Sequence, residues 1–221
     1  MVTILISGSG TGVGKTQVTA ALAGLAHRRG HSVQIVKPVQ TGVARGEPTD
    51  AEIAAKLAHL PSNMAHTLRR FRAALAPLAA AKQAGAQLEL KRVAQEILAL
   101  PQVDFRFVEG AGGIAVPLGP RGWDWADFVP AIDADAVMLV IPDELGAINQ
   151  ARLAYAFARH KCPKKLPIGV ILNAISAPPI AVARSTRAAL IDCQVPLWGE
   201  LSPQSVKLKL HDSPLVRWLN A

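Results

Sequence analysis

A glycine-rich loop near the start of the chain limits the folds available to it. Residues 8–16 read GSGTGVGKT, between an apolar, β-branched segment at 2–7 and an amphipathic segment at 15–29. Glycines let consecutive backbone N–H groups turn inward around phosphate oxygens, and a helix that begins there adds positive potential. The pattern predicts a strand, a phosphate-binding loop and a helix in direct succession.

The last residues of the loop supply polar groups suited to a nucleotide. Lys15 offers a charge for the β- and γ-phosphates of ATP, and Thr16 offers a hydroxyl for Mg²⁺. The strict phosphate-loop pattern has Gly or Ala at position 9, where this chain has Ser9. The alternative is a glycine turn that binds nothing, but a lysine in a tight glycine turn has no packing purpose.

Short apolar segments alternate with amphipathic ones along the rest of the chain. Strands are expected at 2–7, 33–37, 105–109, 136–141, 168–173 and, as the last strand, 195–199; helices are expected at 15–29, 50–60, 88–100, 147–160 and 180–191. This alternation is typical of parallel α/β sheets. We expect a single doubly wound α/β domain over residues 1–221, with a mostly parallel sheet, helices on both faces and the phosphate-loop NTPase type of fold.

Composition narrows the classes of partner. The 24 Lys and Arg against 16 Asp and Glu give a formal charge of +8, but the cations are scattered along the chain. Two cysteines cannot form a disulfide framework. No apolar run approaches the roughly 20 residues of a membrane span, and the N-terminus lacks the pattern of an export signal. The positive charge suits nucleic acid or acidic ligands such as nucleotides and phosphates without requiring either. We expect a cytoplasmic protein that does not bind membranes, with a nucleotide and no nucleic acid as its acidic ligand.

Two carboxylates are candidate ligands for Mg²⁺. Glu109 ends an apolar strand and precedes a glycine turn, and ligands of open α/β sheets bind at that edge. Asp50 could supply another oxygen, although in Pro48-Thr49-Asp50 it could equally be a helix-start residue.

Lys37 ends the second expected strand and should lie at the same sheet edge as Lys15. Two lysines near one ligand suggest a highly anionic group, as in phosphoryl transfer. A lysine that extends from a strand end into solvent is an equally good reading of Lys37 alone.

Taken together, stretches spread over nearly the whole chain resemble those of the dethiobiotin synthetase family, in the same order. They are GSGTGVGKT at 8–16, KPVQTG at 37–42, Asp50, VEGAGGIAVPL at 108–118, LGAIN at 145–149, ILN at 171–173 and VPLWGEL at 195–201. The Glu-Gly-Ala-Gly-Gly stretch paired with the Lys-Pro-Val turn is fairly specific, whereas a phosphate loop alone is not.

The resemblance implies a reaction and a set of roles. The substrates would be 7,8-diaminononanoate, CO₂ and MgATP, joined through a carbamate and a carbamic–phosphoric anhydride. Lys15 and Lys37 match the catalytic cations on phosphate and carbamate, and Thr16, Asp50 and Glu109 match the Mg²⁺ set. Thr11, Thr41 and Asn149 match substrate positions. ATP contacts are implied for Gly12, Val13, Gly14, Lys15, Thr16, Gln17, Asp50, Glu109, Gly110, Ala111, Gly112, Asn173, Ala174, Ser202, Pro203 and Gln204, the last five around the purine.

The resemblance also implies a homodimer with sites at the interface. Free N–H groups at the start of the helix near Ala147 could hold the distant carboxylate of the substrate. In the family this helix serves the neighbouring subunit. From sequence alone, Asn149 could be an ordinary polar residue at a helix start.

The chain departs from the family at several positions. Gly10 and Gly12 stand where acidic residues are frequent, the usual Ser-Pro-His stretch survives only as Ala-Pro-Leu at 76–78, and Gln150 replaces a histidine. These differences concern substrate contacts rather than phosphate chemistry.

Two other functions compete with this reading. A partition-type ATPase would use the basic charge to hold DNA, but it would carry a second loop lysine where this chain has Gly10. An enzyme that amidates another carboxylate usually carries a glutaminase domain, for which 221 residues leave no room.

Overall fold

The computed structural model describes residues 1–203 and 205–221. Its strands are β1 (Val2–Gly8), β2 (Val33–Thr41), β3 (Ala65–Phe71), β4 (Phe105–Glu109), β5 (Ala136–Pro142), β6 (Ile168–Asn173), β7 (Leu197–Leu201) and β8 (Leu208–Leu210). Its α-helices are α1 (Lys15–Arg28), α2 (Asp50–Leu57), α3 (Pro77–Gln83), α4 (Leu90–Leu98), α5 (Trp125–Ala131), α6 (Ala147–Lys161), α7 (Ile180–Asp192) and α8 (Pro214–Leu219).

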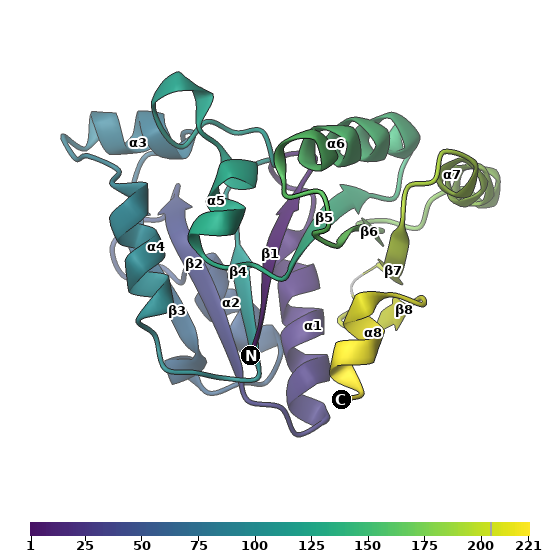
Figure 1. Cartoon of the computed structure of the whole chain (residues 1–221), viewed down its shortest axis with the longest axis horizontal. Helices are drawn as coiled ribbons and strands as arrows, with labels where there is room; N and C mark the ends of the chain where they lie inside the picture. Colours follow the sequence, from purple (N-terminus) through teal and green to yellow (C-terminus); the bar gives the residue numbers. More distant parts are fainter. Residues whose placement is uncertain (204) are drawn as a thin grey trace.

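The strands form one sheet in the order β3-β2-β4-β1-β5-β6-β7-β8. Every neighbouring pair is parallel except β7 and β8, which are antiparallel. From β1 the chain passes to β2 and β3 on one side, returns to β4 between β1 and β2, and then continues outward through β5 to β8 on the other side (Figure 1). Because parallel strands end at the same edge, the loops that follow β1, β2 and β4 lie next to one another, where ligands of such sheets bind.

Alternating side chains divide the core between the two faces of the sheet. On β1, Ile4 and Ile6 pack with α1, α2 and α8, whereas Leu5 packs with α4, α5 and α6. The same alternation continues on β4, where Phe107 faces the first group of helices and Val108 the second. Helices thus cover both faces, and the expected doubly wound, mostly parallel α/β fold is confirmed (Figure 1).

Several elements differ from the sequence-based expectation. The strand expected at 195–199 lies at 197–201, and it is not the last, since β8 adds an antiparallel edge after it. The edge strand β3 was not expected, because its sequence AHTLRRF is polar and only half-buried. Its Arg69 extends to Glu96 on α4, so this strand is held partly by a surface ion pair. The short helices α3, α5 and α8 were also missed.

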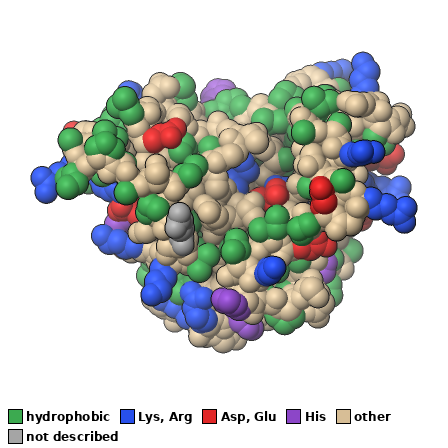
Figure 2. Space-filling view, turned by 180° about the vertical axis from the view of Figure 1, so that it is seen from behind, with side chains coloured by type: hydrophobic (Ala, Val, Ile, Leu, Met, Phe, Trp, Pro, Cys, Tyr) green, Lys and Arg blue, Asp and Glu red, His purple; other side chains and the backbone are tan. Residues whose placement is uncertain are grey.

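In the part of the chain that the structure describes, no helix is both long and apolar enough to cross a membrane. Lys and Arg side chains are spread around the face seen in Figure 2 and do not gather in one patch.

Candidate functional site

The loop between β1 and α1 has the backbone shape expected of a phosphate cradle. Gly12 and Gly14 have φ values of +77° and +83°, which residues other than glycine rarely adopt. At Gly14 a Cβ would also lie 1.9 Å from Nδ2 of Asn173. That Nδ2 donates a hydrogen bond of 2.9 Å to the carbonyl of Val13, so the end of β6 supports the loop from beneath.

Lys15 folds back over the loop. Its Nζ donates to the carbonyl of Gly10 at 2.8 Å, and its side chain is largely buried. Burial, together with the nearby Lys37 charge, lowers the pKa of Lys15 to about 8, although Glu109 and Asp50 partly oppose the shift. The loop thus holds a cation whose charge a phosphate group would stabilise.

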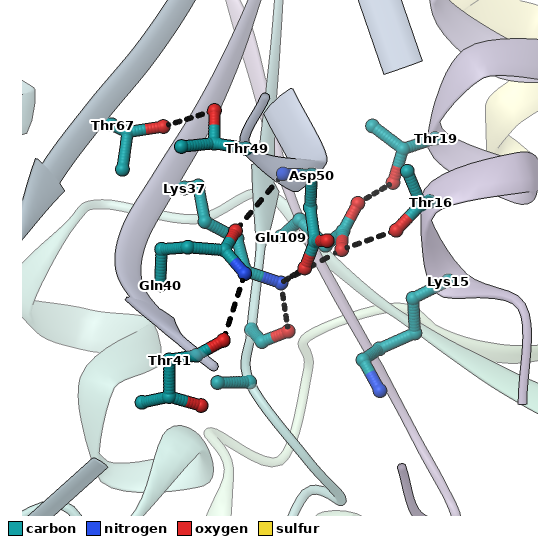
Figure 3. A network of polar contacts seen from close by, with 12 residues as sticks. Lys15, Thr16, Thr19, Lys37, Gln40, Thr41, Thr49, Asp50, Thr67 and Glu109 are labelled. Carbon is teal, nitrogen blue, oxygen red and sulfur yellow. Dashed lines mark hydrogen bonds and ion pairs between the residues drawn. The ribbon is translucent and has the colours of Figure 1, made fainter. Parts of the chain in front are cut away.

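A buried ion cluster lies beside the loop (Figure 3). Lys37 Nζ is 2.6 Å from Asp50 Oδ2 and 2.8 Å from Glu109 Oε1, and it also donates to the carbonyl of Gly110. Burial alone would lower the pKa of Lys37, but the Glu109 and Asp50 charges and hydrogen bonds outweigh it and raise the pKa. Lys37 therefore stays positively charged within the site.

Strand register explains why these side chains meet. Val36 of β2 pairs with Val108 of β4, so the next residues, Lys37 and Glu109, lie side by side on neighbouring strands. Lys37 was expected to end its strand, but β2 continues to Thr41 because it goes on pairing with β3 beyond Lys37. By alternation both point to the same face as Phe107, toward the first turns of α1 and α2.

Two threonines of α1 hold the Glu109 carboxylate. Thr16 Oγ1 donates to Oε1 at 3.0 Å, and Thr19 Oγ1 donates to Oε2 at 2.8 Å. Both carboxylate oxygens are therefore fixed in direction, and Glu109 is only 1% exposed. Thr19 was missed by sequence reasoning; its spacing of one helical turn from Thr16 was the available signal.

Asp50 is both a helix-start residue and a site residue, so the two sequence-based readings of it do not exclude each other. It is the first residue of α2, after Thr49, which forms a reciprocal capping box with Glu52. The backbone N–H of Asp50 donates to Gln40 Oε1 at 2.9 Å. Gln40 is buried and was given no role from the sequence, yet it ties β2 to the start of α2.

These groups surround a cavity of about 900 Å³. Among the predicted site residues, those that line it are Thr11, Gly12, Gly14, Lys15, Thr16, Gln17, Lys37, Thr41, Asp50, Glu109, Ala111 and Gly112. The cavity also has an apolar part of its wall that was not foreseen, to which Val43, Leu75, Pro77 and Val116 belong. The cavity can thus accommodate both an anionic group and an aliphatic chain.

The oxygen atoms of this cavity fit a hard divalent cation. A threonine hydroxyl and two carboxylates are ligands that Mg²⁺ accepts, and Mg²⁺ usually takes few protein ligands beside phosphate and water. Among the described residues no group of three or more His, Cys, Asp and Glu side chains is arranged to hold a metal.

The remaining predicted residues lie outside that lining. Ala174, Ser202 and Pro203 line a second cavity of about 330 Å³, beside Asp143 and Arg187. Val13 and Gly110 are in the loops of the main cavity without lining it, and Asn173 lies behind the phosphate loop. Asn149 is exposed at the start of α6 and does not line the cavity of its own chain. Gln204 lies outside the described residues.

Sequence reasoning also missed an ion cluster beside the second cavity. Arg187 of α7 donates to both oxygens of the buried Asp143 and also contacts Glu200 of β7, which in turn pairs with His211. This cluster links the ends of β5 and β7 to α7. The residues are far apart in sequence, and no motif connects them.

Comparison with known proteins shows the family to which the chain is related. Residues 2–206 match a family described as an AAA domain. The chain is 39% identical over 163 residues to the ATP-dependent dethiobiotin synthetase BioD of Frankia casuarinae, covering 73% of this chain and 67% of the relative. It is 38% identical over 198 residues to the enzyme of the same name from Mycobacterium bovis BCG Pasteur, covering 86% and 82%.

Several solved structures have a fold similar to that of this chain. The plasmid partition protein of Borrelia burgdorferi has a TM-score of 0.57 at 14% identity, covering 99% of this chain and 95% of that protein. The signal recognition particle receptor FtsY of Elizabethkingia anophelis has a TM-score of 0.59 at 14% identity, covering 99% and 64%. At this identity the likeness concerns the fold alone.

Proposed function

The chain belongs to the family of ATP-dependent dethiobiotin synthetases, and from this premise we propose that it closes the ureido ring of dethiobiotin from 7,8-diaminononanoate, CO₂ and ATP. One observation carries the proposal: Lys15, Lys37, Asp50 and Glu109 surround a single cavity at the phosphate loop. Two lysines and two carboxylates there suit a reaction between a carbamate, an anionic derivative of carbonic acid, and a nucleotide phosphate.

The proposed reaction has three steps. One amine of the substrate attacks CO₂ and loses a proton, which gives a carbamate. A carbamate oxygen then attacks the γ-phosphorus of ATP, and the bond between this phosphorus and the β,γ-bridging oxygen breaks. ADP leaves, and a carbamic–phosphoric anhydride remains. The second amine attacks the carbonyl carbon of the anhydride, so that the ring closes, a proton is lost and phosphate is released.

The lysines stabilise the negative charge in these steps. Lys15 follows the loop glycines and lies where it can contact the transferred phosphoryl group. Lys37, whose charge is held by Asp50 and Glu109, lies beside it for the carbamate oxygen. Attraction between two cations and two anions offsets the repulsion between the lysines before the ligands bind.

Mg²⁺ would be held by Thr16, Asp50 and Glu109 together with oxygens of ATP. When bound, it neutralises phosphate charge and orients the phosphate chain. The hydroxyls of Thr16 and Thr19 already orient Glu109, and a cation bound there would share Oε1 with Lys37 Nζ, which lies 2.8 Å away.

Further roles follow from position in the fold. Thr11 and Thr41 line the main cavity and would contact the diamine, whose hydrocarbon chain the apolar wall would accept. Asn173, Ala174, Ser202, Pro203 and Gln204 would surround the purine. Gly12, Val13, Gly14, Gln17, Gly110, Ala111 and Gly112 would complete the contacts to ATP.

We also propose a cytoplasmic homodimer in which the whole chain, residues 1–221, acts as one phosphate-loop domain. Asn149 and the first N–H groups of α6 would bind the distant carboxylate of the diamine held by the neighbouring subunit. The exposure of Asn149, which does not line its own cavity, supports this arrangement.

Phosphate release from MgATP and bicarbonate, measured with and without 7,8-diaminononanoate, tests the proposal. We expect strong stimulation by the diamine and a cyclic urea as the product, identified by mass spectrometry. ATP binding without stimulation would contradict the proposal and would favour a nucleotide-dependent switch, for which salt-dependent DNA binding is the next measurement.

A further inference from the structure

Two residues 141 positions apart form a hydrogen bond across the start of the phosphate loop. Ser9 Oγ donates to Gln150 Oε1 at 2.6 Å. Ser9 directly follows β1, and Gln150 lies in the first turn of α6. Ser9 stands where the strict phosphate-loop pattern has Gly or Ala. The structure shows that the hydroxyl at this position contacts the first turn of α6.

The backbone around Ser9 is already fixed on its other sides. Its N–H donates to the carbonyl of Val140 at 3.2 Å, and the neighbouring Gly8 carbonyl accepts from the N–H of Ile114 at 2.9 Å. A Cβ at Gly113 would lie 3.0 Å from the Ser9 carbonyl oxygen, so these backbones are in close contact. Gln150 adds a side-chain hydrogen bond to a segment whose backbone is already restrained by these contacts.

The loop is therefore anchored at both ends by side chains from distant elements. Gln150 holds its beginning through Ser9, and Asn173 holds its end through the carbonyl of Val13. Between these anchors Thr11 and Gly12 are exposed to the cavity. The anchors limit how far the backbone N–H groups can move before a phosphate arrives, which favours binding because less ordering is required.

We propose that Gln150 is a positioning residue for the phosphate loop and acts on nucleotide binding through Ser9. The inference rests on the proposed function in that its ligand is a nucleotide. Gln150 lies next to Asn149 on α6, so the helix that would serve the neighbouring site also fixes the phosphate loop of its own chain.

Binding of Mg²⁺ with β,γ-imido-ATP, measured by titration calorimetry, tests the inference without any turnover. We expect Ser9→Ala and Gln150→Met each to weaken the affinity about three- to tenfold, the effect of one net hydrogen bond. The double variant should be no weaker than the weaker single variant, because both changes remove the same bond. Ser9→Thr, which keeps the hydroxyl, should stay within about twofold of the natural chain.

Gln95→Met is the matched control, since Gln95 is exposed on α4, far from the loop in sequence and on another helix. Unchanged affinity in both single variants, or effects that multiply in the double variant, would overturn the inference. Steady-state kinetics add a second readout: KM for MgATP should rise in Gln150→Met while kcat changes little. If nucleotide affinity depends on Ser9 and Gln150 but the protein makes no dethiobiotin, the proposed function is refuted and the inference about Gln150 stands.

Discussion

Lys37 Nζ lies 2.8 Å from the Glu109 carboxylate, and the two side chains are 3% and 1% exposed. A charge so deeply buried is costly unless a partner and hydrogen bonds compensate it. Here Asp50, Thr16 and Thr19 complete the compensation. The pair therefore keeps two opposite charges in place at the point where the nucleotide phosphates are proposed to bind.

Replacing Lys37 separates catalysis from binding. In Lys37→Met we expect dethiobiotin formation to fall by about 10²- to 10³-fold or more, because a cation that stabilises developing charge is lost. Affinity for the imido nucleotide should change by less than about tenfold, since the loop and Lys15 remain. Product formation by mass spectrometry and calorimetric binding measure the two effects.

Lys56→Met, an exposed position on α2, is the control for loss of one positive charge. If Lys37→Met loses nucleotide binding altogether, Lys37 supports the architecture of the site and is not a catalytic residue. A thermal melt records the accompanying cost, which for a buried ion pair broken on one side is about 3–5 kcal/mol.

Glu109→Gln tests the Mg²⁺ assignment. The substitution keeps the size of the side chain but removes the charge that a divalent cation prefers. It also replaces one of the two oxygens that accept from Thr16, Thr19 and Lys37 with an amide donor. We expect the Mg²⁺ concentration for half-maximal activity to rise by about tenfold or more, the change that a loss near 1.4 kcal/mol produces. Glu96→Gln, which alters a surface pair with Arg69, should leave the metal titration unchanged. An unchanged titration in Glu109→Gln would remove this residue from the metal set.

Arg187 is predicted to stabilise the sheet edge next to the second cavity. Asp143 is almost completely buried, and Arg187 contacts both of its oxygens. Arg187→Met should lower the free energy of unfolding by about 1.5–3 kcal/mol, the range for hydrogen bonds to charged groups. Arg184→Met, an exposed position one turn earlier on the same helix, should change stability much less. Equal denaturation midpoints for the two variants would contradict this role.

The local pattern of the sequence predicted most of the parallel sheet and the phosphate loop. Each expected strand contains an apolar run or a β-branched segment, and the loop is contiguous in sequence. Lys37 and Glu109 could be placed at one edge but not side by side, because their contact depends on β2 and β4 being neighbours, and strand order is not encoded in either segment. Gln40 and Arg187 were missed for the same reason: their partners are brought together only by the fold.

The edge of the sheet was harder to predict than its centre. Edge strands are half-exposed and carry polar residues, so they lack the apolar run that identifies a central strand. In β3 the two consecutive residues Arg69 and Arg70 obscure the alternation, although Phe71 is buried at the strand end.

The proposed dimer makes activity depend on the exposed face of α6. Leu153 is 64% exposed and lies four residues after Asn149, on the same side of the helix. Leu153→Asp should dissociate the dimer and abolish dethiobiotin formation while leaving nucleotide binding intact. Light scattering after gel filtration and the product assay measure this; Ile191→Asp on α7 is the control, as Ile191 is also exposed. A fully active monomer would contradict a site completed by the neighbouring subunit.

Nucleotide binding should depend on pH through Lys15. Its pKa in the free protein is about 8, lowered mainly by burial, and bound phosphates would raise it because they favour the charged form. Binding therefore takes up protons at and above pH 8, and affinity falls as pH rises, by up to about tenfold per pH unit. Calorimetry at pH 7 and pH 9 in buffers of different ionisation enthalpy counts these protons. Lys15→Arg, which stays charged throughout, should lose this proton uptake; equal uptake by both proteins would show that another group titrates.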